Sequence, residues 1–274
     1  MASASSWEVA KRVKTRLRED RLSIVAAGVA FYALMAVFPA LIALVGLYGL
    51  AFDPQQVARQ AAAFSAMLPP EAAAVVLGQL HDLVQTDRNA LGFGALAGLL
   101  LALWSASAGV RTLMEALNIA WHEEERRGFF RFYATALLLT LSAIVGVMLA
   151  IGMVVALPVV IRFLGLTTLL EGVLSLARWP ILVGMMLAGL AIVYRFGPCR
   201  AAPRQTWLSP GAVFATGLWV LGSALFSLYV AQFGNYNETY GSVGAVVILL
   251  MWFLLSSYAV LIGAEIDAEL AAMG

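Results

Sequence analysis

Long stretches without any Asp, Glu, Lys or Arg alternate with short polar segments along this chain. A helix needs about 20 apolar residues to cross a bilayer, because each residue rises about 1.5 Å and the hydrocarbon core is about 30 Å thick. Six stretches reach or approach that length, with approximate bounds 22–52, 89–110, 132–161, 179–194, 210–232 and 242–263. The pattern predicts an all-α, polytopic membrane protein in which six transmembrane helices form a single domain over residues 1–274.

The polar segments predict surface helices and loops. The first 23 residues are polar and basic, with apolar positions spaced for a short helix on the membrane surface. Asp53 to Arg88 is expected to lie on the membrane as a lid, and Arg111 to Arg131 to be a charged connection. We expect a short loop over Arg162 to Arg178, with the next helix beginning at Trp179-Pro180, because proline suits a first helical turn.

Composition strengthens the membrane prediction and excludes several other classes. Hydrophobic residues make up 62% of the chain and charged residues 12%, whereas soluble domains average about 45–50% and 25%. The single cysteine, Cys199, excludes a disulfide framework or a cysteine metal cluster. Nucleic-acid binding relies on clustered Lys and Arg residues that neutralise phosphates, and a net charge of +1 does not favour it. No nucleic-acid partner is therefore expected.

The distribution of basic residues predicts the orientation. Thirteen of the 17 Lys and Arg residues fall in the N-terminal tail and in the second-to-third and fourth-to-fifth connections, which alternate to one side of the membrane. Cytoplasmic loops are enriched in Lys and Arg. Both termini are therefore expected in the cytoplasm.

A search for catalytic chemistry finds none of the usual signatures. His81 and His122 lack a second histidine or cysteine at a metal-ligand spacing, and the acidic run beside His122 is typical of a solvated surface. The chain has no nucleophile elbow, no Walker loop and no paired carboxylates within the spans. We expect no cofactor, no metal and no enzymatic activity.

Polar positions on two spans are candidates for a pathway through the protein. Thr216, Ser223 and Ser227 fall on one face of the fifth span, where they indicate either helix packing, the simpler interpretation, or a polar cavity lining. Tyr32 and Pro39 on the first span are consistent with a kinked, gate-forming helix, although a tyrosine there could instead reach the interface. Gly94-x-x-x-Gly98 on the second span is a weak signal for close helix approach.

The segment 234–244 is expected to be a shaped hairpin on the outer side. Its glycines permit left-handed or closely packed backbone, and its asparagines can bond their own backbone in turns. The residues singled out as pathway candidates are Asn235, Asn237, Tyr240 and Gly241. The alternative interpretation is a sturdy interfacial turn without a pathway role.

Glu265 is expected to form an ion pair on the cytoplasmic side. It follows the sixth span, where a carboxylate opposes the helix dipole and an unpaired charge near the membrane is costly. Arg111 and Arg195 are the candidate partners, because each directly ends an uncharged span. The alternative is that Glu265 points into the cytoplasm.

Motifs from about Leu22 to Leu270 point to one known family. They are Ala30-Phe31-Tyr32-Ala33-Leu34 with Phe38-Pro39, Leu117-Asn118 with Trp121, Glu124-Glu125-Arg126-Arg127, Tyr194-Arg195-Phe196 with Pro198, and residues 233–244 with Trp252 and Gly263-Ala264-Glu265. Together they resemble the BrkB/YihY family of bacterial inner-membrane proteins. Cys199 and Asp267 stand where asparagine is expected.

The resemblance implies a six-helix membrane protein. Some members were once labelled ribonuclease BN, a label later regarded as mistaken, and others were linked to serum resistance or lipid export. Two functions are therefore carried forward: a transporter or flippase-like exporter of a lipid or amphiphilic solute, and a non-transporting scaffold or assembly or virulence-associated factor. Membrane lipids are expected partners in both cases, and a homo-oligomer is compatible with both.

Overall fold

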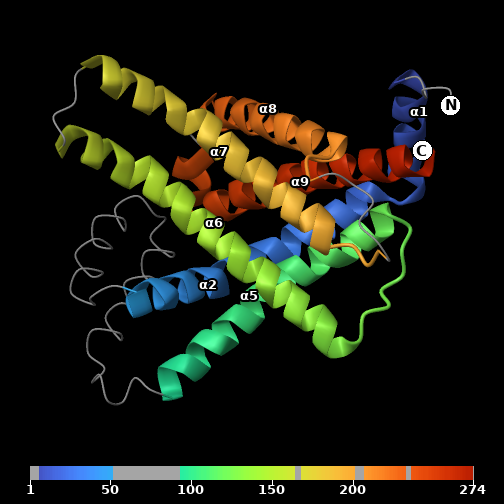
Figure 1. Ribbon diagram of the computed structural model, residues 1–274, viewed down its shortest axis with the longest axis horizontal. Coiled ribbons are helices and arrows are strands. Elements are labelled where there is room, and N and C mark those ends of the chain that lie inside the picture. Colours follow the sequence, from blue (N-terminus) through green and yellow to red (C-terminus); the bar gives the residue numbers. More distant parts are fainter. Residues whose placement is uncertain (1–5, 52–92, 164–167, 201–206, 233–235, 274) are drawn as a thin grey trace.

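The computed structural model of the protein describes residues 6–51, 93–163, 168–200, 207–232 and 236–273 (Figure 1). All regular secondary structure in these ranges is helical. The helices are α1 (Ser6–Glu19), α2 (Leu22–Ala51), α5 (Phe93–Ala120), α6 (Phe129–Phe163), α7 (Thr168–Phe196), α8 (Pro210–Gln232) and α9 (Tyr236–Met273). The predicted lid and His81 lie outside the described residues.

Six of these helices are long and apolar enough to cross a membrane, which confirms the predicted fold class. Only 11 to 28% of their apolar windows is buried within the chain. Large side chains such as Leu101 on α5, Leu138 on α6 and Leu228 on α8 are more than half exposed. Such surfaces require lipid around them, because an exposed apolar face of this extent is not stable in water.

Two predicted boundaries are wrong because single charged or proline residues do not end these helices. α5 continues past Arg111 to Ala120, so Arg111 lies within a helix rather than in a connection. α7 begins at Thr168, which places Pro180 inside it and removes the loop expected over Arg162 to Arg178. A long arginine side chain can carry its charge to the interface, and proline is tolerated in membrane helices where its surroundings satisfy the freed carbonyl.

The hairpin expected over residues 234–244 is also not formed. α9 begins at Tyr236, so Asn237, Tyr240 and Gly241 lie in its first two turns. Glycines and asparagines permit a turn but do not require one, and helix propensity is only a weak prior that the surroundings override. Asn235 lies outside the described residues.

The helices form an inner group and an outer hairpin. α2 packs against both α5 and α9, and α8 packs against α9. α6 and α7 run antiparallel across this group, with contacts chiefly to α5, to α8 and to each other (Figure 1). α1 lies against the last turns of α9, and we call this part of the molecule the α1 end.

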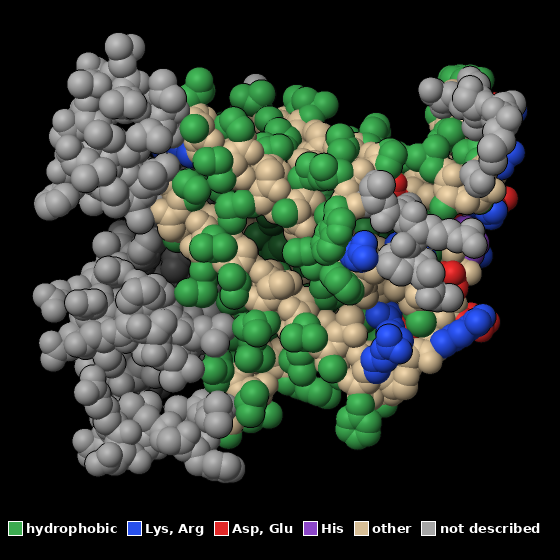
Figure 2. All heavy atoms as spheres, viewed as in Figure 1, with side chains coloured by type: hydrophobic (Ala, Val, Ile, Leu, Met, Phe, Trp, Pro, Cys, Tyr) green, Lys and Arg blue, Asp and Glu red, His purple; other side chains and the backbone are tan. Residues whose placement is uncertain are grey.

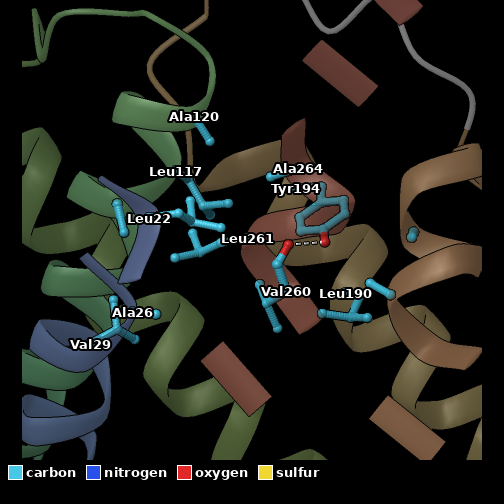
Figure 3. Close-up of a cluster of buried hydrophobic side chains, with 13 residues drawn as sticks. Leu22, Ala26, Val29, Leu117, Ala120, Leu190, Tyr194, Val260, Leu261 and Ala264 are labelled. Carbon is cyan, nitrogen blue, oxygen red and sulfur yellow. Dashed lines mark hydrogen bonds between the residues drawn. The ribbon is translucent and has the colours of Figure 1, made fainter. Parts of the chain in front are cut away.

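The largest buried cluster lies at the α1 end. Leu22 of α2, Leu117 of α5 and Leu261 of α9 are almost fully buried there, beside Tyr194 of α7 (Figure 3). The hydroxyl of Tyr194 donates a hydrogen bond to the carbonyl of Val260, which ties α7 to α9. Four helices that are distant in sequence therefore meet at one buried point.

Glycine lets two helix pairs approach closely, although not at the expected motif. Gly98 has open space where a Cβ would lie. A Cβ at Gly211 of α8 would instead overlap the backbone of Gly263 on α9, and one at Gly263 would meet Gly211 and Tyr194. The α8–α9 contact at the α1 end thus depends on two glycines rather than on a G-x-x-x-G pair.

Candidate functional site

The first polar assembly at the α1 end is built around Asn118, near the C-terminus of α5. Its side-chain nitrogen donates to Glu125 at 3.0 Å, and its side-chain oxygen accepts from the backbone nitrogen of Cys199 at 2.7 Å. Asn118 is 5% exposed. One amide therefore joins the connection after α5 to the connection after α7.

Arg127 completes this assembly. Its Nε and Nη2 donate to the two oxygens of Glu125 at 2.7 and 2.6 Å, the bidentate geometry that suits guanidinium and carboxylate. The same guanidinium donates to the carbonyls of Phe196 and Gly197 at the end of α7, at 3.1 and 2.8 Å. Arg200 stacks on Trp121 with 3.8 Å between its Cζ and the ring centroid. The resemblance motifs around 118, 125 and 195 are thus one structural unit.

The charge balance of this assembly is favourable. Partial burial alone would raise the pKa of Glu125, but hydrogen bonds from Arg127 and Asn118 outweigh it and lower that pKa from 4.5 to about 2. The hydrogen bond to Glu125 likewise raises the pKa of Arg127. Both groups are charged at neutral pH, and they hold two connections together.

The second assembly surrounds Arg111. Trp104 and Tyr133 stack with their ring centroids 4.7 Å apart, and the guanidinium lies 5.4 and 4.9 Å from those centroids. Arg111 also donates to the hydroxyl of Ser107 one turn earlier. Within the described residues it forms no ion pair with a carboxylate. The guanidinium is therefore held by aromatic rings and a hydroxyl, with its charge uncompensated.

The third assembly is the acidic end of α9, where Glu265, Asp267 and Glu269 are all buried. Asp267 accepts from the backbone nitrogen of Gly211 at 2.7 Å and so satisfies the N-terminus of α8. Glu269 accepts from Arg16 of α1 at 3.1 Å, and this bond raises the pKa of Arg16. Neither carboxyl oxygen of Glu265 has a hydrogen-bond partner among the described residues.

The ion pair expected between Glu265 and Arg111 or Arg195 is not formed in the described part of the chain. Arg111 lies in its aromatic cluster, and Arg195 lies over Trp207 with 4.5 Å between its Cζ and the ring centroid. Glu265 faces Asp20 instead. The prediction assumed that the ends of these helices lie at a similar depth in the membrane. Which way each side chain points also depends on the rotation of each helix about its own axis, and the sequence does not give that rotation.

Of the three residues on the polar face expected on α8, only Ser223 forms a hydrogen bond to α9 within the described residues. Thr216 is buried and donates to the carbonyl of Ala212 at 2.8 Å. Ser223 accepts from the indole nitrogen of Trp252 at 3.4 Å, while Trp219 donates to Ser256 at 3.0 Å. Ser227 is exposed. These contacts favour the helix-packing interpretation over a continuous polar lining.

Tyr32 and Pro39 take no part in the side-chain contacts described above. Tyr32 is 46% exposed beside Phe31, and Pro39 lies inside α2. The side chains of Asn237 and Tyr240 are not described. In the ranges that the structure covers, no group of three or more His, Cys, Asp or Glu side chains is arranged to hold a metal ion.

The sequence analysis missed several participants, among them Asp20, Trp104 and Tyr133. Trp104 stands seven residues before Arg111, a spacing that places both on one helix face and could have indicated their contact. Asp20 and Tyr133 belong to other helices or turns, and their sequence neighbours carry no signal of the pairing.

Comparison with known proteins places the chain in a family. Residues 13–273 match the family model described as virulence factor BrkB. The ribonuclease-like protein YfkH of Bacillus subtilis is 32% identical over 252 residues, which cover 89% of this chain and 88% of that protein.

Proteins called UPF0761 membrane protein are also similar. The one from Aeromonas salmonicida is 27% identical over 94% of this chain and 87% of its own length. The one from Albidiferax ferrireducens is 27% identical over 97% of this chain, which spans 63% of the length of that relative. No solved structure matches the chain. The matched range covers the motifs of all three polar assemblies, and the chain is a membrane protein of the virulence factor BrkB family.

Proposed function

We propose that this protein is a transporter or flippase-like exporter of a lipid or amphiphilic solute, and not an enzyme, in the bacterial inner membrane with both termini in the cytoplasm. The observation that carries the proposal is the guanidinium of Arg111 within α5, which forms no ion pair with a carboxylate of the described residues. An amphiphile with an anionic head group fits that arrangement, because arginine binds phosphate or carboxylate oxygens while apolar helix faces receive the acyl chains.

The surface around α6 and α7 supports an amphiphilic substrate. Figure 2 shows hydrophobic side chains over this face and a hollow between the two helices. Lys and Arg side chains gather toward the α1 end of the same face. Apolar surface and basic charge are thus separated along the molecule. This arrangement is complementary to the acyl chains and the anionic head group of a lipid.

The alternative is a non-transporting scaffold, with assembly of copies or of other membrane proteins as its role. The α8–α9 contacts of Ser223 and Trp219 favour it, because they pack polar groups that a pathway would leave available. Membrane lipids, and no nucleic acid, are the partners under either function. A homo-oligomer fits the exposed apolar faces of α6 and α7.

A flux assay in liposomes distinguishes the two functions. The full chain is reconstituted with fluorescent phospholipids carrying either an anionic or a zwitterionic head group, and lipid movement between leaflets is followed. Arg111→Ala should slow movement of the anionic lipid about tenfold, the loss expected for one charge-assisted hydrogen bond of about 1.4 kcal/mol. Arg111→Lys should retain part of the rate, because it keeps the charge but not the planar fork.

Arg18→Ala is the matched control, since Arg18 is an exposed α1 arginine, and it should leave the rate unchanged. A wild-type protein that moves neither lipid faster than empty liposomes would favour the scaffold. Equal rates for wild type and Arg111→Ala would remove Arg111 from the substrate site.

The proposed orientation has its own test. In a Cys199→Ser background, single cysteines at Ser5 or Gly274 should resist a membrane-impermeant maleimide added outside intact cells. Cysteines at Gln79 or Thr168 should react. Labelling of Ser5 from outside would reverse the orientation.

A further inference from the structure

The carboxyl group of Glu265 is buried without a donor. The residue is 0% exposed, and neither of its oxygens has a hydrogen-bond partner among the described residues. Buried carboxylates in proteins are normally paired or hydrogen-bonded, because removing the charge from water is otherwise very costly. An unpartnered carboxyl at this depth requires either neutralisation or a bound cation.

Asp20 faces Glu265 from the turn between α1 and α2. Among the neighbouring side chains, the carboxyl group of Asp20 has the largest electrostatic effect on Glu265. The turn is held by Asp20 N donating to the Arg16 carbonyl at 2.9 Å, and by left-handed backbone at Arg21 with φ 48°. Two acceptors thus meet across the α1–α9 contact at a fixed position.

The other charged groups near the pair are already engaged or are themselves acidic. Arg16 of α1 donates to Glu269 and Glu19, and Arg12 lies 4.0 Å from Glu269. Asp267 of α9 accepts from α8. α2 and α8 carry no charged residue. On α5, Arg111 is held in its aromatic cluster and Glu115 is exposed.

His122 connects the pair to water. Its Nε2 lies 3.5 Å from Oδ2 of Asp20, and its side chain is 45% exposed whereas that of Asp20 is 14% exposed. The backbone nitrogen of His122 donates to the Ile119 carbonyl at 3.0 Å, which fixes the residue just beyond α5. Histidine exchanges protons near neutral pH, so it suits a connection between bulk water and a buried acid.

We propose that Asp20 and Glu265 form a proton-binding pair that exchanges with bulk water through His122. Two facing carboxyl groups without a donor between them are stable when they share one proton, which converts one of them into a donor to the other. A multivalent metal ion would need more oxygen ligands than this pair offers. The site goes beyond the transport proposal, because proton binding does not require that the protein move any substrate.

Proton loss has a structural consequence at this site. It places two negative charges beside Glu269, where α1 docks on α9. α1 is bound there through Arg16 and through Leu17, which packs against the buried cluster, so repulsion acts against a small contact. Deprotonation should therefore loosen α1 from the bundle.

Infrared difference spectroscopy of the full chain in lipid nanodiscs tests the pair directly. The carbonyl stretch of a protonated carboxyl group should be present at neutral pH and should disappear on alkaline titration. Glu265→Gln should abolish this band, and Glu115→Gln, which replaces an exposed glutamate, should leave it unchanged. A wild-type spectrum without the band at neutral pH, or a band retained in Glu265→Gln, would overturn the proposal.

Asp20→Asn is the second variant, and it keeps the test decisive if Glu265→Gln fails to fold. Asparagine removes the like charge, so the remaining carboxyl should lose its proton at a lower pH than in the wild type. An unchanged titration midpoint in Asp20→Asn would show that the two groups do not share a proton. These measurements read protonation only, so they stand whether or not the liposome assay detects transport.

Discussion

Glu125 and Glu265 lie at the same end of the molecule but in opposite surroundings. Glu125 is partly exposed and receives donors from Arg127 and Asn118. Glu265 is fully buried, receives no donor from the described residues and faces another carboxyl group. The more exposed glutamate is therefore the better satisfied one, which reverses the usual relation between burial and pairing.

The contrast indicates different roles for the two residues. Glu125 is a structural carboxylate, whereas the carboxyl group of Glu265 is free to bind a proton. The bonds of Glu125 extend through Arg127 to the α7 carbonyls, so its charge holds two connections together. Glu265 receives no such donor among the described residues, so its carboxyl group joins no two segments in this way. Strained or unsatisfied polar groups in native proteins are often functional, which is why the α9 end merits a functional test.

The largest effect is expected from Arg127→Ala. It removes both bonds to Glu125 and leaves the carbonyls of Phe196 and Gly197 without these donors. The free energy of unfolding should fall by about 2–3 kcal/mol, the range for hydrogen bonds to charged groups. Reversible unfolding in mixed detergent micelles measures it.

Arg126→Ala is the neighbouring control, because the described contact of Arg126 uses its backbone nitrogen. An Arg127→Ala loss no larger than the loss in this control would mean that Glu125 and Glu265 do not differ in structural importance.

The pH dependence of stability should differ between wild type and Glu125→Gln. The pKa of Glu125 is lowered from 4.5 to about 2 on folding, so its contribution is present above 4.5 and is lost as pH falls toward 2. The wild type should be the more stable protein at neutral pH, and its advantage over Glu125→Gln should vanish across that window. A stability difference that stays constant from pH 6 to pH 2 would contradict the Arg127 pairing.

Asp267→Ala should have an intermediate effect. It removes the acceptor for Gly211 N at the start of α8, and loss of a helix-capping carboxylate costs about 1 kcal/mol. Asp267→Asn should recover most of this loss, because an amide oxygen accepts the same bond. Hydrogen exchange in the first turn of α8, faster in Asp267→Ala alone, is the local readout.

Glu265→Gln should have the smallest effect on stability, within about 0.5 kcal/mol of the wild type at acid pH, where the carboxyl of the wild type is protonated in both the folded and the unfolded state. An amide has nearly the same shape as the protonated carboxyl and loses no donor there. As the pH rises toward neutral the wild type should become the less stable of the two, because its unfolded state releases a proton that its folded state retains, whereas glutamine has none to release. A large loss at neutral pH would indicate that Glu265 has a structural partner and would end its contrast with Glu125.

The six membrane-spanning helices were readable from the sequence because they depend on local composition. Uncharged stretches such as 210–232 must be helical in lipid, where every backbone group needs an internal partner, and α8 has those bounds. The predicted helix boundaries were less accurate where a single residue was taken as the end or the start of a helix. Arg111 and Pro180 both lie inside longer helices, because a helix ends where its surroundings change rather than at one side chain.

The polar assemblies depend on how helices are rotated and packed. Asn118, Glu125 and Arg195 were singled out by sequence, but only the folded chain joins Asn118 to Cys199, 81 residues away. Likewise, Glu265 was expected beside an arginine and lies against Asp20, 245 positions earlier in the chain.

The sequence by itself determined six membrane helices and the side on which the basic residues gather, since hydropathy and charge act over neighbouring residues. The tertiary structure alone decided which charges meet. The Gly211–Gly263 contact and the hydrogen bond from Tyr194 to Val260 fix the relation of α9 to α7 and α8, while Arg16 of α1 bonds to Glu269 of α9. Pairings of this kind arise from packing between segments that are distant in sequence, so local sequence patterns do not predict them.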